Sequence, residues 1–371
     1  MSAYLEVNVK KIQELINFAN KTVLGNFKNK ITVVKGNGYG HDVNLIVPLA
    51  VKAGSSILAV ARVDEGIEVR NILNKLKSKL PILCLGIIDE CNYATCIKND
   101  ISVPIANLDQ AKRVAKLNIK GLKVHWKLNT GMNRIGFKNT KDLLEAYKLI
   151  DKKNVIHYGI FSHIFDNDRL ISMKTQFERF EGLMKAIPNW EKIPLRHIRA
   201  TGGSLANWLG TIPKRPWETA ARYGCLSFCD YRKNKNKPES FNTFRLVANV
   251  IQINNLVKND YTGYDSKYFS KTNERSALIP IGWGDGLQRS FAKTGTVYIN
   301  GKAYKPIGKM SMDSFAIKVD NSVKFGDKVY IFKDINHALT CIEDKTDLAN
   351  IIAILCCLTK RIPRVPVKEF K

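Results

Sequence analysis

Short apolar runs rich in β-branched residues alternate with segments of helical periodicity between residues 31 and 228. The helical segments, such as 63–79 and 140–152, are long enough to return the chain to a parallel neighbouring strand. Eight such units predict a (β/α)8 barrel, the TIM barrel, while the alternation alone also fits a doubly wound open sheet. The expected strands cover residues 31–35, 56–61, 80–85, 101–106, 122–128, 155–162, 195–200 and 222–228.

The pattern changes at residues 234–238, a polar stretch that ends in proline and is typical of a domain linker. Beyond it, short alternating runs are separated by turn signals such as Asn300-Gly301, and a last helix is expected over 347–358. We therefore expect two domains, a barrel over residues 1–235 and a mainly β domain over 236–371. The expected strands of the second domain cover residues 246–256, 277–281, 296–299, 302–306, 315–319 and 328–332.

Composition narrows the class of protein. The chain has 371 residues, of which 45% are hydrophobic, and 59 Lys and Arg against 33 Asp and Glu give a net charge of +26. The lysines are scattered, and no stretch interleaves basic with aromatic residues, so nucleic-acid binding is not favoured. The N-terminus lacks a secretory signal, no apolar run reaches membrane-spanning length, and the eight cysteines lack the spacing of a metal site. We expect a cytoplasmic protein with a small-molecule substrate, and neither a metal nor a membrane partner.

Lys35 is the first candidate for chemistry. It closes the apolar run 31–34 and opens the glycine-rich segment 36–41. An amine at the end of a rigid strand keeps its position, and the following glycines let a cofactor approach the backbone, as a Schiff-base lysine requires. The common alternative is a solvated lysine after an edge strand.

Further polar residues follow the later strands, so a barrel would bring them to one face. Arg134 follows the fifth strand, His163 ends the sixth, Thr201-Gly202-Gly203-Ser204 opens the helix after the seventh, and Arg222 begins the eighth. Hydroxyls and free N–H groups at a helix start suit a phosphate. Taken singly, these residues also fit a helix cap, a core histidine and rim ion pairs. Their joint position favours a pyridoxal-phosphate site.

Four segments resemble motifs of one family. Residues 33–41 resemble the cofactor-lysine motif of alanine racemases, and residues 127–136 are similar to their Lys-x-Asp-Thr-Gly-Met-x-Arg-x-Gly motif. Residues 279–286 and 308–313 resemble two motifs of the family's C-terminal domain. The resemblance implies a fold-type III pyridoxal-phosphate racemase. It also implies a homodimer in which each active site combines the barrel of one subunit with the β domain of the other.

The resemblance also implies residue roles. Lys35 would bind pyridoxal 5'-phosphate and act as one base, and Tyr264 would be the second base on the opposite face of the substrate. Arg222 would face the pyridine nitrogen and be bonded by His163. The other implied roles are cofactor contacts from Tyr39, Leu85, Thr201, Gly224 and Cys225, substrate-carboxylate contacts from Arg134 and the Met312 N–H, and support from Lys127 (if carbamylated, by orienting Arg134), Asp313 and Trp283.

The implied activity is the interconversion of L- and D-alanine, an isomerase reaction that supplies D-alanine for peptidoglycan. Several residues depart from the family pattern: Asn129 replaces an Asp, Trp283 replaces a Tyr, Lys360 replaces a phosphate-binding Tyr, and Ala200-Thr201 replaces an Asn-Ser pair. These departures keep both bases but leave open a racemase of the same fold that acts on serine, lysine or several amino acids. A carrier protein with the barrel but no turnover is a further alternative.

Overall fold

The computed structural model describes residues 3–117, 119–151, 155–166, 169–228, 230, 243–341 and 348–370. The chain forms two compact units. We call Gln13–Gly38 with Val43–Lys237 the barrel unit, and Met1–Ile12, Tyr39–Asp42 and Pro238–Lys371 the β-rich unit. The expected linker at 234–238 lies outside the described residues.

The barrel unit contains one sheet of eight parallel strands in the order β8-β7-β6-β5-β4-β3-β2-β9. Between β8 and β9 the ring is closed by backbone hydrogen bonds, from Thr219 N to Arg196 O and from Arg222 N to Arg199 O, both 3.1 Å. The predicted TIM barrel is therefore confirmed over the open sheet. The strands are β2 (Asn29–Val33), β3 (Ile57–Val60), β4 (Ile82–Cys84), β5 (Ile101–Ile105), β6 (Lys123–Lys127), β7 (Ile156–Phe161), β8 (Leu195–His197) and β9 (Ala220–Tyr223).

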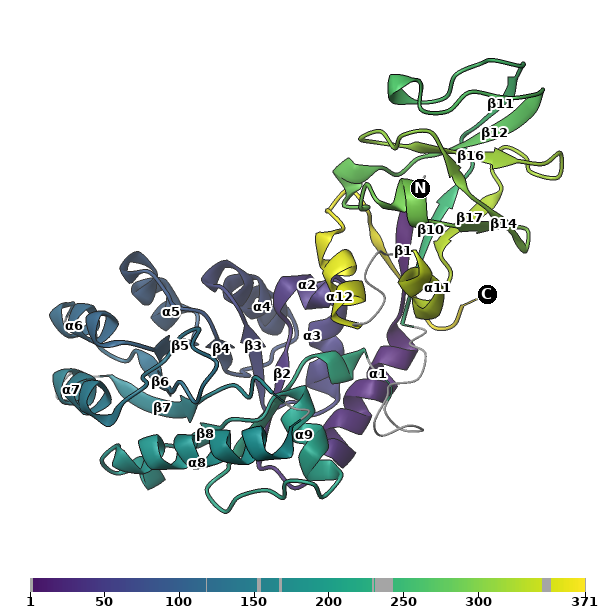
Figure 1. The fold of residues 1–371 in the computed structure, drawn as a ribbon. Helices are drawn as coiled ribbons and strands as arrows, with labels where there is room; N and C mark the ends of the chain where they lie inside the picture. Colours follow the sequence, from purple (N-terminus) through teal and green to yellow (C-terminus); the bar gives the residue numbers. More distant parts are fainter. Residues whose placement is uncertain are drawn as a thin grey trace. The chain divides into compact units, whose positions relative to one another are not determined.

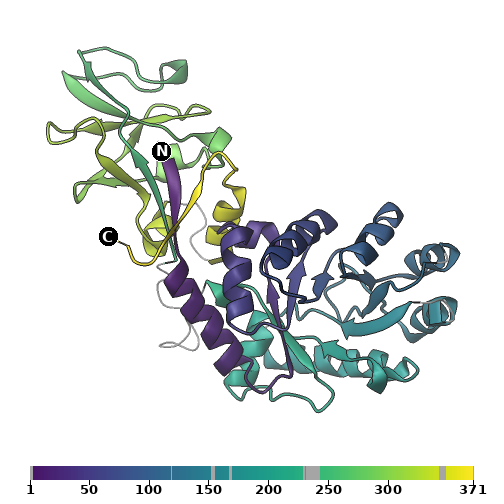
Figure 2. The same ribbon diagram turned by 180° about the vertical axis from the view of Figure 1, so that it is seen from behind.

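Helices of the barrel unit lie outside its strands in both views (Figure 1 and Figure 2). Each buries one face; in α7 the buried residues Leu143, Ala146, Tyr147 and Ile150 follow the spacing of an amphipathic helix. None of the described helices is long and apolar enough to cross a membrane. The helices that connect or follow the strands are α3 (Val43–Lys52), α4 (Val63–Lys75), α5 (Tyr93–Lys98), α6 (Leu108–Lys116), α7 (Thr140–Asp151), α8 (Leu170–Ala186) and α9 (Thr201–Trp208), and α1 (Val9–Phe18) precedes them.

The eighth strand was placed too late in the sequence. Strand β9 ends at Tyr223, and Cys225–Ser227 form a 3-10 turn, so Arg222 lies within the strand and does not begin it. The small residues Ala220 and Ala221 are fully buried and pair with β2, whereas the apolar Leu226 is buried by the turn. The apolar run that predicted a strand here therefore belongs to a buried turn.

The β-rich unit contains a six-stranded sheet, β14-β13-β17-β10-β1-β18, and a four-stranded sheet, β11-β12-β16-β15. The predicted mainly β domain is confirmed. Its elements are β1 (Ala3–Asn8), β10 (Phe244–Asn249), β11 (Gln252–Leu256), β12 (Glu274–Ile279), α10 (Phe291–Thr294), β13 (Val297–Ile299), β14 (Lys302–Tyr304), β15 (Pro306–Ile307), β16 (Phe315–Val319), β17 (Lys328–Phe332), α11 (Ile335–Thr340), α12 (Leu348–Cys357) and β18 (Arg364–Val367).

Two features of the β-rich unit differ from the expectation. The single strand expected over 246–256 is two strands in different sheets, because the Val250 N–H donates to Asp327 O whereas the Ile251 N–H donates to Leu278 O. Strand β1 pairs antiparallel with β10 and parallel with β18. The first residues of the chain therefore belong to the β-rich unit, where their backbone hydrogen bonds are made.

Candidate functional site

The carboxyl ends of the barrel strands carry most of the expected site. Lys35 follows β2 with only Val34 between, Lys127 ends β6, and His163 lies two residues after β7. Thr201 begins α9, soon after β8. In a parallel barrel these ends lie on one face, where the active sites of such barrels are built. Leu85 follows β4 directly and is half-buried.

The backbone after Lys35 is fixed in an unusual conformation. In the short turn α2 (Lys35–Tyr39), φ is +61° at Gly36, +53° at Asn37, +62° at Gly38 and +55° at Tyr39, so the turn is left-handed. Glycine at two of these positions avoids the steric cost that other residues meet there. The Gly36 N–H also donates to Oε1 of Glu65 at 2.6 Å. The exposed Lys35 side chain therefore extends from a rigid start. Tyr39, at the end of the turn, is grouped with the β-rich unit.

Arg222 is a buried cation with neutral partners. It donates to Ser162 O at 2.5 Å, to Ile198 O at 3.4 Å and to Nδ1 of His197. The histidine bonded to Arg222 is thus His197 and not His163 as expected, because His197 ends the strand next to β9 around the barrel. Burial lowers the pKa of Arg222 to about 9, so the guanidinium remains charged at neutral pH.

The same cation perturbs its neighbours. Burial, then the charges of Arg222 and Arg134, lower the pKa of Lys127 to about 7, and the Lys127 amine donates to Leu128 O at 2.9 Å. Burial, then Arg222, Arg134, Lys127 and Lys35, lower the pKa of His163 to about 3. All the charged groups that shift these two side chains are cations. This face of the barrel therefore favours an anionic ligand.

The start of α9 forms a second element of the site. The first N–H groups of a helix have no partner within it, and Ala200, which precedes α9, provides no side-chain cap. The Thr201 hydroxyl accepts from the Gly224 N–H at 3.3 Å, which joins the helix start to the turn that contains Cys225. Free N–H groups and a hydroxyl fit a phosphate. With the Lys35 amine and the Arg222 cation, the donors suit pyridoxal phosphate.

Within the β-rich unit, Tyr264 is held in an exposed position. The residue is 63% exposed, in a short turn (Tyr264–Ser266) that follows Gly263 at φ +78°. The next residue, Asp265, forms an ion pair with Lys309 and so ties this turn to the segment 308–313. The phenol of Tyr264 is therefore presented to solvent from an anchored loop.

Met312 and Trp283 lie in two segments that are packed against each other. The Gly284 N–H donates to Met312 O at 2.9 Å, and a Cβ on Gly282 would lie 2.3 Å from that oxygen, so only glycine fits there. Arg361 joins the segments, since its guanidinium contacts Asp285 at 3.1 Å and Asp313 at 2.6 Å. Asp313 therefore supports the Met312 loop through Arg361.

Sequence reasoning missed Arg361 and His197. The signal for Arg361 would have been the buried Asp285 within a glycine-rich turn, which needs a cation. For His197, the signal was its position at the end of the seventh barrel strand. The same kind of position, after the sixth barrel strand, had made His163 a candidate.

The fold and the barrel-face residues define a class of protein, a (β/α)8 barrel with a lysine after a strand end and cationic groups that suit a phosphorylated cofactor. Comparison with known proteins gives the family. Models of the alanine racemase N-terminal and C-terminal domains match residues 7–231 and 243–366. Alanine racemase 1 of Clostridium acetobutylicum is 31% identical over 91% of this chain and 89% of its own length. The chain therefore belongs to the alanine racemase family, whose members are pyridoxal-phosphate-dependent isomerases.

Two further relatives span nearly the whole chain. An alanine racemase of Helicobacter pylori is 28% identical over 98% of both chains. A crystal structure of alanine racemase from Bacillus anthracis with bound L-Ala-P has a TM-score of 0.86, covers 100% of this chain and 96% of its own, and is 23% identical. At that identity the structural match supports the fold alone.

Proposed function

We propose that this protein interconverts L- and D-alanine with pyridoxal 5'-phosphate, with Lys35 and Tyr264 as the two bases. The observation that carries the proposal is the rigid left-handed turn after Lys35, on the barrel face that also carries the buried Arg222 cation. The names of the full-length relatives support alanine as the substrate.

The cofactor would be held by groups of the barrel unit. Lys35 would bind it covalently, the start of α9 with Thr201 and the Gly224–Cys225 turn would hold its phosphate, and Leu85 would pack against it. When bound, pyridoxal phosphate withdraws electrons from the substrate's α-carbon and so acidifies its proton. Arg222 would donate to the pyridine nitrogen and disfavour its protonation, because two adjacent cations repel. A weaker electron sink discourages side reactions such as transamination.

Racemisation needs one base on each face of the α-carbon. One of Lys35 and Tyr264 would remove the proton and the other would deliver a proton to the opposite face. Arg134 and the Met312 N–H would receive the substrate carboxylate. We propose that Lys127 is carbamylated and then orients Arg134. A pKa near 7 supports this, since the neutral amine is the form that adds carbon dioxide.

We also propose a cytoplasmic homodimer in which Tyr264 completes the site of the partner subunit, for D-alanine supply to peptidoglycan. The exposed and anchored position of Tyr264 supports this arrangement. Mixing inactive Lys35→Ala and Tyr264→Phe subunits should restore activity, because the mixed dimer regains one site with both bases. Each variant alone is the control. A stable mixed dimer without activity would contradict the shared site.

The activity itself is tested on the purified protein. We expect the absorbance band of the lysine-bound cofactor, and the fastest loss of optical rotation with L-alanine when L-alanine, L-serine and L-lysine are compared. Tyr264→Phe should keep the band and lose most of the racemisation. Faster racemisation of serine or lysine would assign that amino acid as the substrate in place of alanine. An absorbance band without turnover would indicate a carrier protein.

A further inference from the structure

Arg199 is fully buried two residues before Thr201, where the proposed phosphate seat begins, and all its N–H groups donate hydrogen bonds. Its Nε and Nη2 donate to the Glu218 carboxylate at 2.8 and 2.9 Å. Nη1 donates to Gly203 O at 2.8 Å and Ile212 O at 3.0 Å, and Nη2 also donates to Pro213 O at 2.9 Å. Neither Arg199 nor Glu218 is a member of the proposed site.

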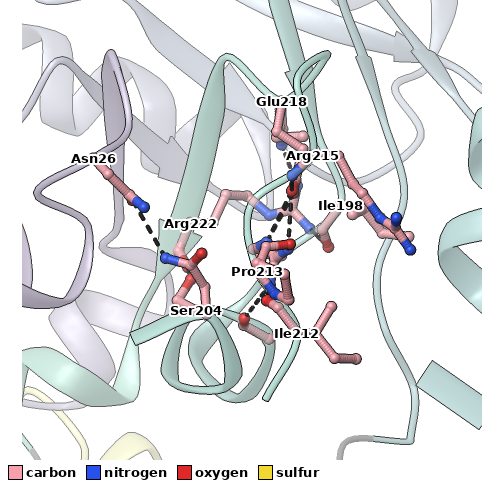
Figure 3. A network of polar contacts seen from close by, with 12 residues as sticks. Asn26, Ile198, Ser204, Ile212, Pro213, Arg215, Glu218 and Arg222 are labelled. Atoms are coloured by element: carbon pink, nitrogen blue, oxygen red, sulfur yellow. Dashed lines mark hydrogen bonds and ion pairs between the residues drawn. The ribbon is translucent and has the colours of Figure 1, made fainter. Parts of the chain in front are cut away.

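These contacts converge on α9 and β9. Gly203 lies in the first turn of α9, and the Arg199 carbonyl accepts from the Arg222 N–H at 3.1 Å. Ser204, the next residue of α9, donates to Arg222 O at 3.2 Å. Figure 3 shows Ser204 and Arg222 beside the loop of Ile212, Pro213 and Glu218. The Arg199–Glu218 pair thus links the loop 212–218 to the helix start.

A buried ion pair alone adds little net stability, since desolvation of the two charges offsets their attraction. Here, however, three of the Arg199 bonds end on backbone carbonyls, which fixes the path of the chain. The helix start needs such support, because it begins with Thr201-Gly202-Gly203 and Ala200 gives it no side-chain cap. Glycines at these positions leave the free backbone flexible.

We propose that Arg199, held by Glu218, is a positioning residue that fixes the start of α9 for the cofactor phosphate. This inference rests on the proposed phosphate seat. A positioning role has a consequence that general stability lacks, because pyridoxal without its phosphate does not use the seat. The ratio of the dissociation constants of pyridoxal and pyridoxal phosphate therefore measures how much the phosphate seat contributes to binding.

The test titrates the cofactor-free protein with both compounds and follows fluorescence. Arg199→Met should raise the dissociation constant of pyridoxal phosphate about tenfold, equal to about 1.4 kcal/mol, and leave the dissociation constant of pyridoxal unchanged. In the double variant Arg199→Met/Glu218→Leu, removal of both charges should restore thermal stability but not the ratio. The matched control is Arg70→Met, which removes another buried arginine of the barrel that donates to the carbonyls of Asn99 and Asp100. It should leave the ratio unchanged.

Two further outcomes separate this inference from the proposed seat. If Thr201→Ala lowers the ratio and the Arg199 variants do not, the positioning role is wrong and the seat stands. If Thr201→Ala also leaves the ratio unchanged, the seat itself is wrong. Arg199→Met could instead weaken the binding of both compounds equally, with binding restored in the double variant. That result would mean that the ion pair only stabilises the fold, and it would overturn the proposal.

Discussion

Lys127→Met offers a quantitative test of the charged barrel face. The Lys127 pKa is lowered from 10.5 to about 7, mainly by burial and then by the cations Arg222 and Arg134. At about 1.4 kcal/mol for each pKa unit, the protonated amine lowers the free energy of unfolding by on the order of 5 kcal/mol. Methionine has a similar volume and no charge, so it removes this cost. It also loses the hydrogen bond to Leu128 O, worth about 1 kcal/mol.

The pH dependence follows from the direction of the shift. Between about pH 7 and pH 10.5 the unfolded chain binds the Lys127 proton and the folded chain does not, so the wild type gains stability as pH rises. Below that window both states are protonated and the cost is complete; above it the cost is absent. In cofactor-free protein without carbon dioxide, Lys127→Met should therefore be several kcal/mol more stable than wild type near pH 7, and slightly less stable near pH 10.5.

Urea unfolding at both pH values measures the difference. Lys123→Met is the control, because Lys123 lies on the same strand but pairs with Asp100 at 2.5 Å, so its removal should not stabilise the protein near pH 7. Adding bicarbonate should stabilise the wild type and not Lys127→Met, since carbamylation would turn the amine into an anion beside cations. Equal stability changes for Lys127→Met at the two pH values would refute the reasoning.

Two other predictions concern the barrel interior. Burial, then Arg222, lower the pKa of His125 to about 3, so the wild type should lose stability as pH falls from 6.5 towards 3. In acid-unfolding curves, His125→Leu should reduce the slope of the unfolding free energy against pH by about 1.4 kcal/mol per pH unit. An unchanged slope would contradict a buried, neutral His125 ring. A Cβ on Gly159 would lie 2.1 Å from Nδ1 of His125, so Gly159→Ala should cost about 1–3 kcal/mol in urea unfolding. The control Gly182→Ala meets no atom within 4 Å and should be neutral or slightly stabilising, and a similar loss in both variants would show that contact with His125 is not the cause.

The sequence predicted the barrel because its signal is local. Each unit repeats an apolar run and an amphipathic helix, and the parallel connection follows from their lengths. Strands β1 and β18 were missed because they lie at the two ends of the chain, outside these repeating units, and their pairing joins distant segments: Leu5 lies opposite Leu246 on one side and Arg364 on the other. Such pairing leaves no local pattern. For the same reason the N-terminal residues were assigned to the barrel.

The site divides in a similar way. Residues recognised by position at a strand end, such as Lys35 and His163, follow the carboxyl ends of β2 and β7. What could not be predicted is which neighbour each group contacts. His163 follows β7 and His197 ends the neighbouring strand β8, and the two side chains have the same chemistry. Only the order of the strands around the barrel explains why His197 is the histidine that contacts Arg222. Asn129 shows the reverse case, since its side chain accepts from the N–H groups of Gly131 and Asn133 as an Asp would, and the substitution keeps the loop.

The net charge of +26 has a local counterpart that matters more for function. Scattered surface lysines are screened by solvent and salt over about 10 Å. Arg222 is buried, and its hydrogen bonds are made to neutral groups, so its charge acts on Lys127 and His163 with little screening. A buried cation whose described acceptors are all neutral still carries a desolvation cost, which an anionic or electron-rich ligand beside it would reduce. If the cofactor binds beside Arg222 as proposed, its binding should therefore raise the stability of the folded barrel.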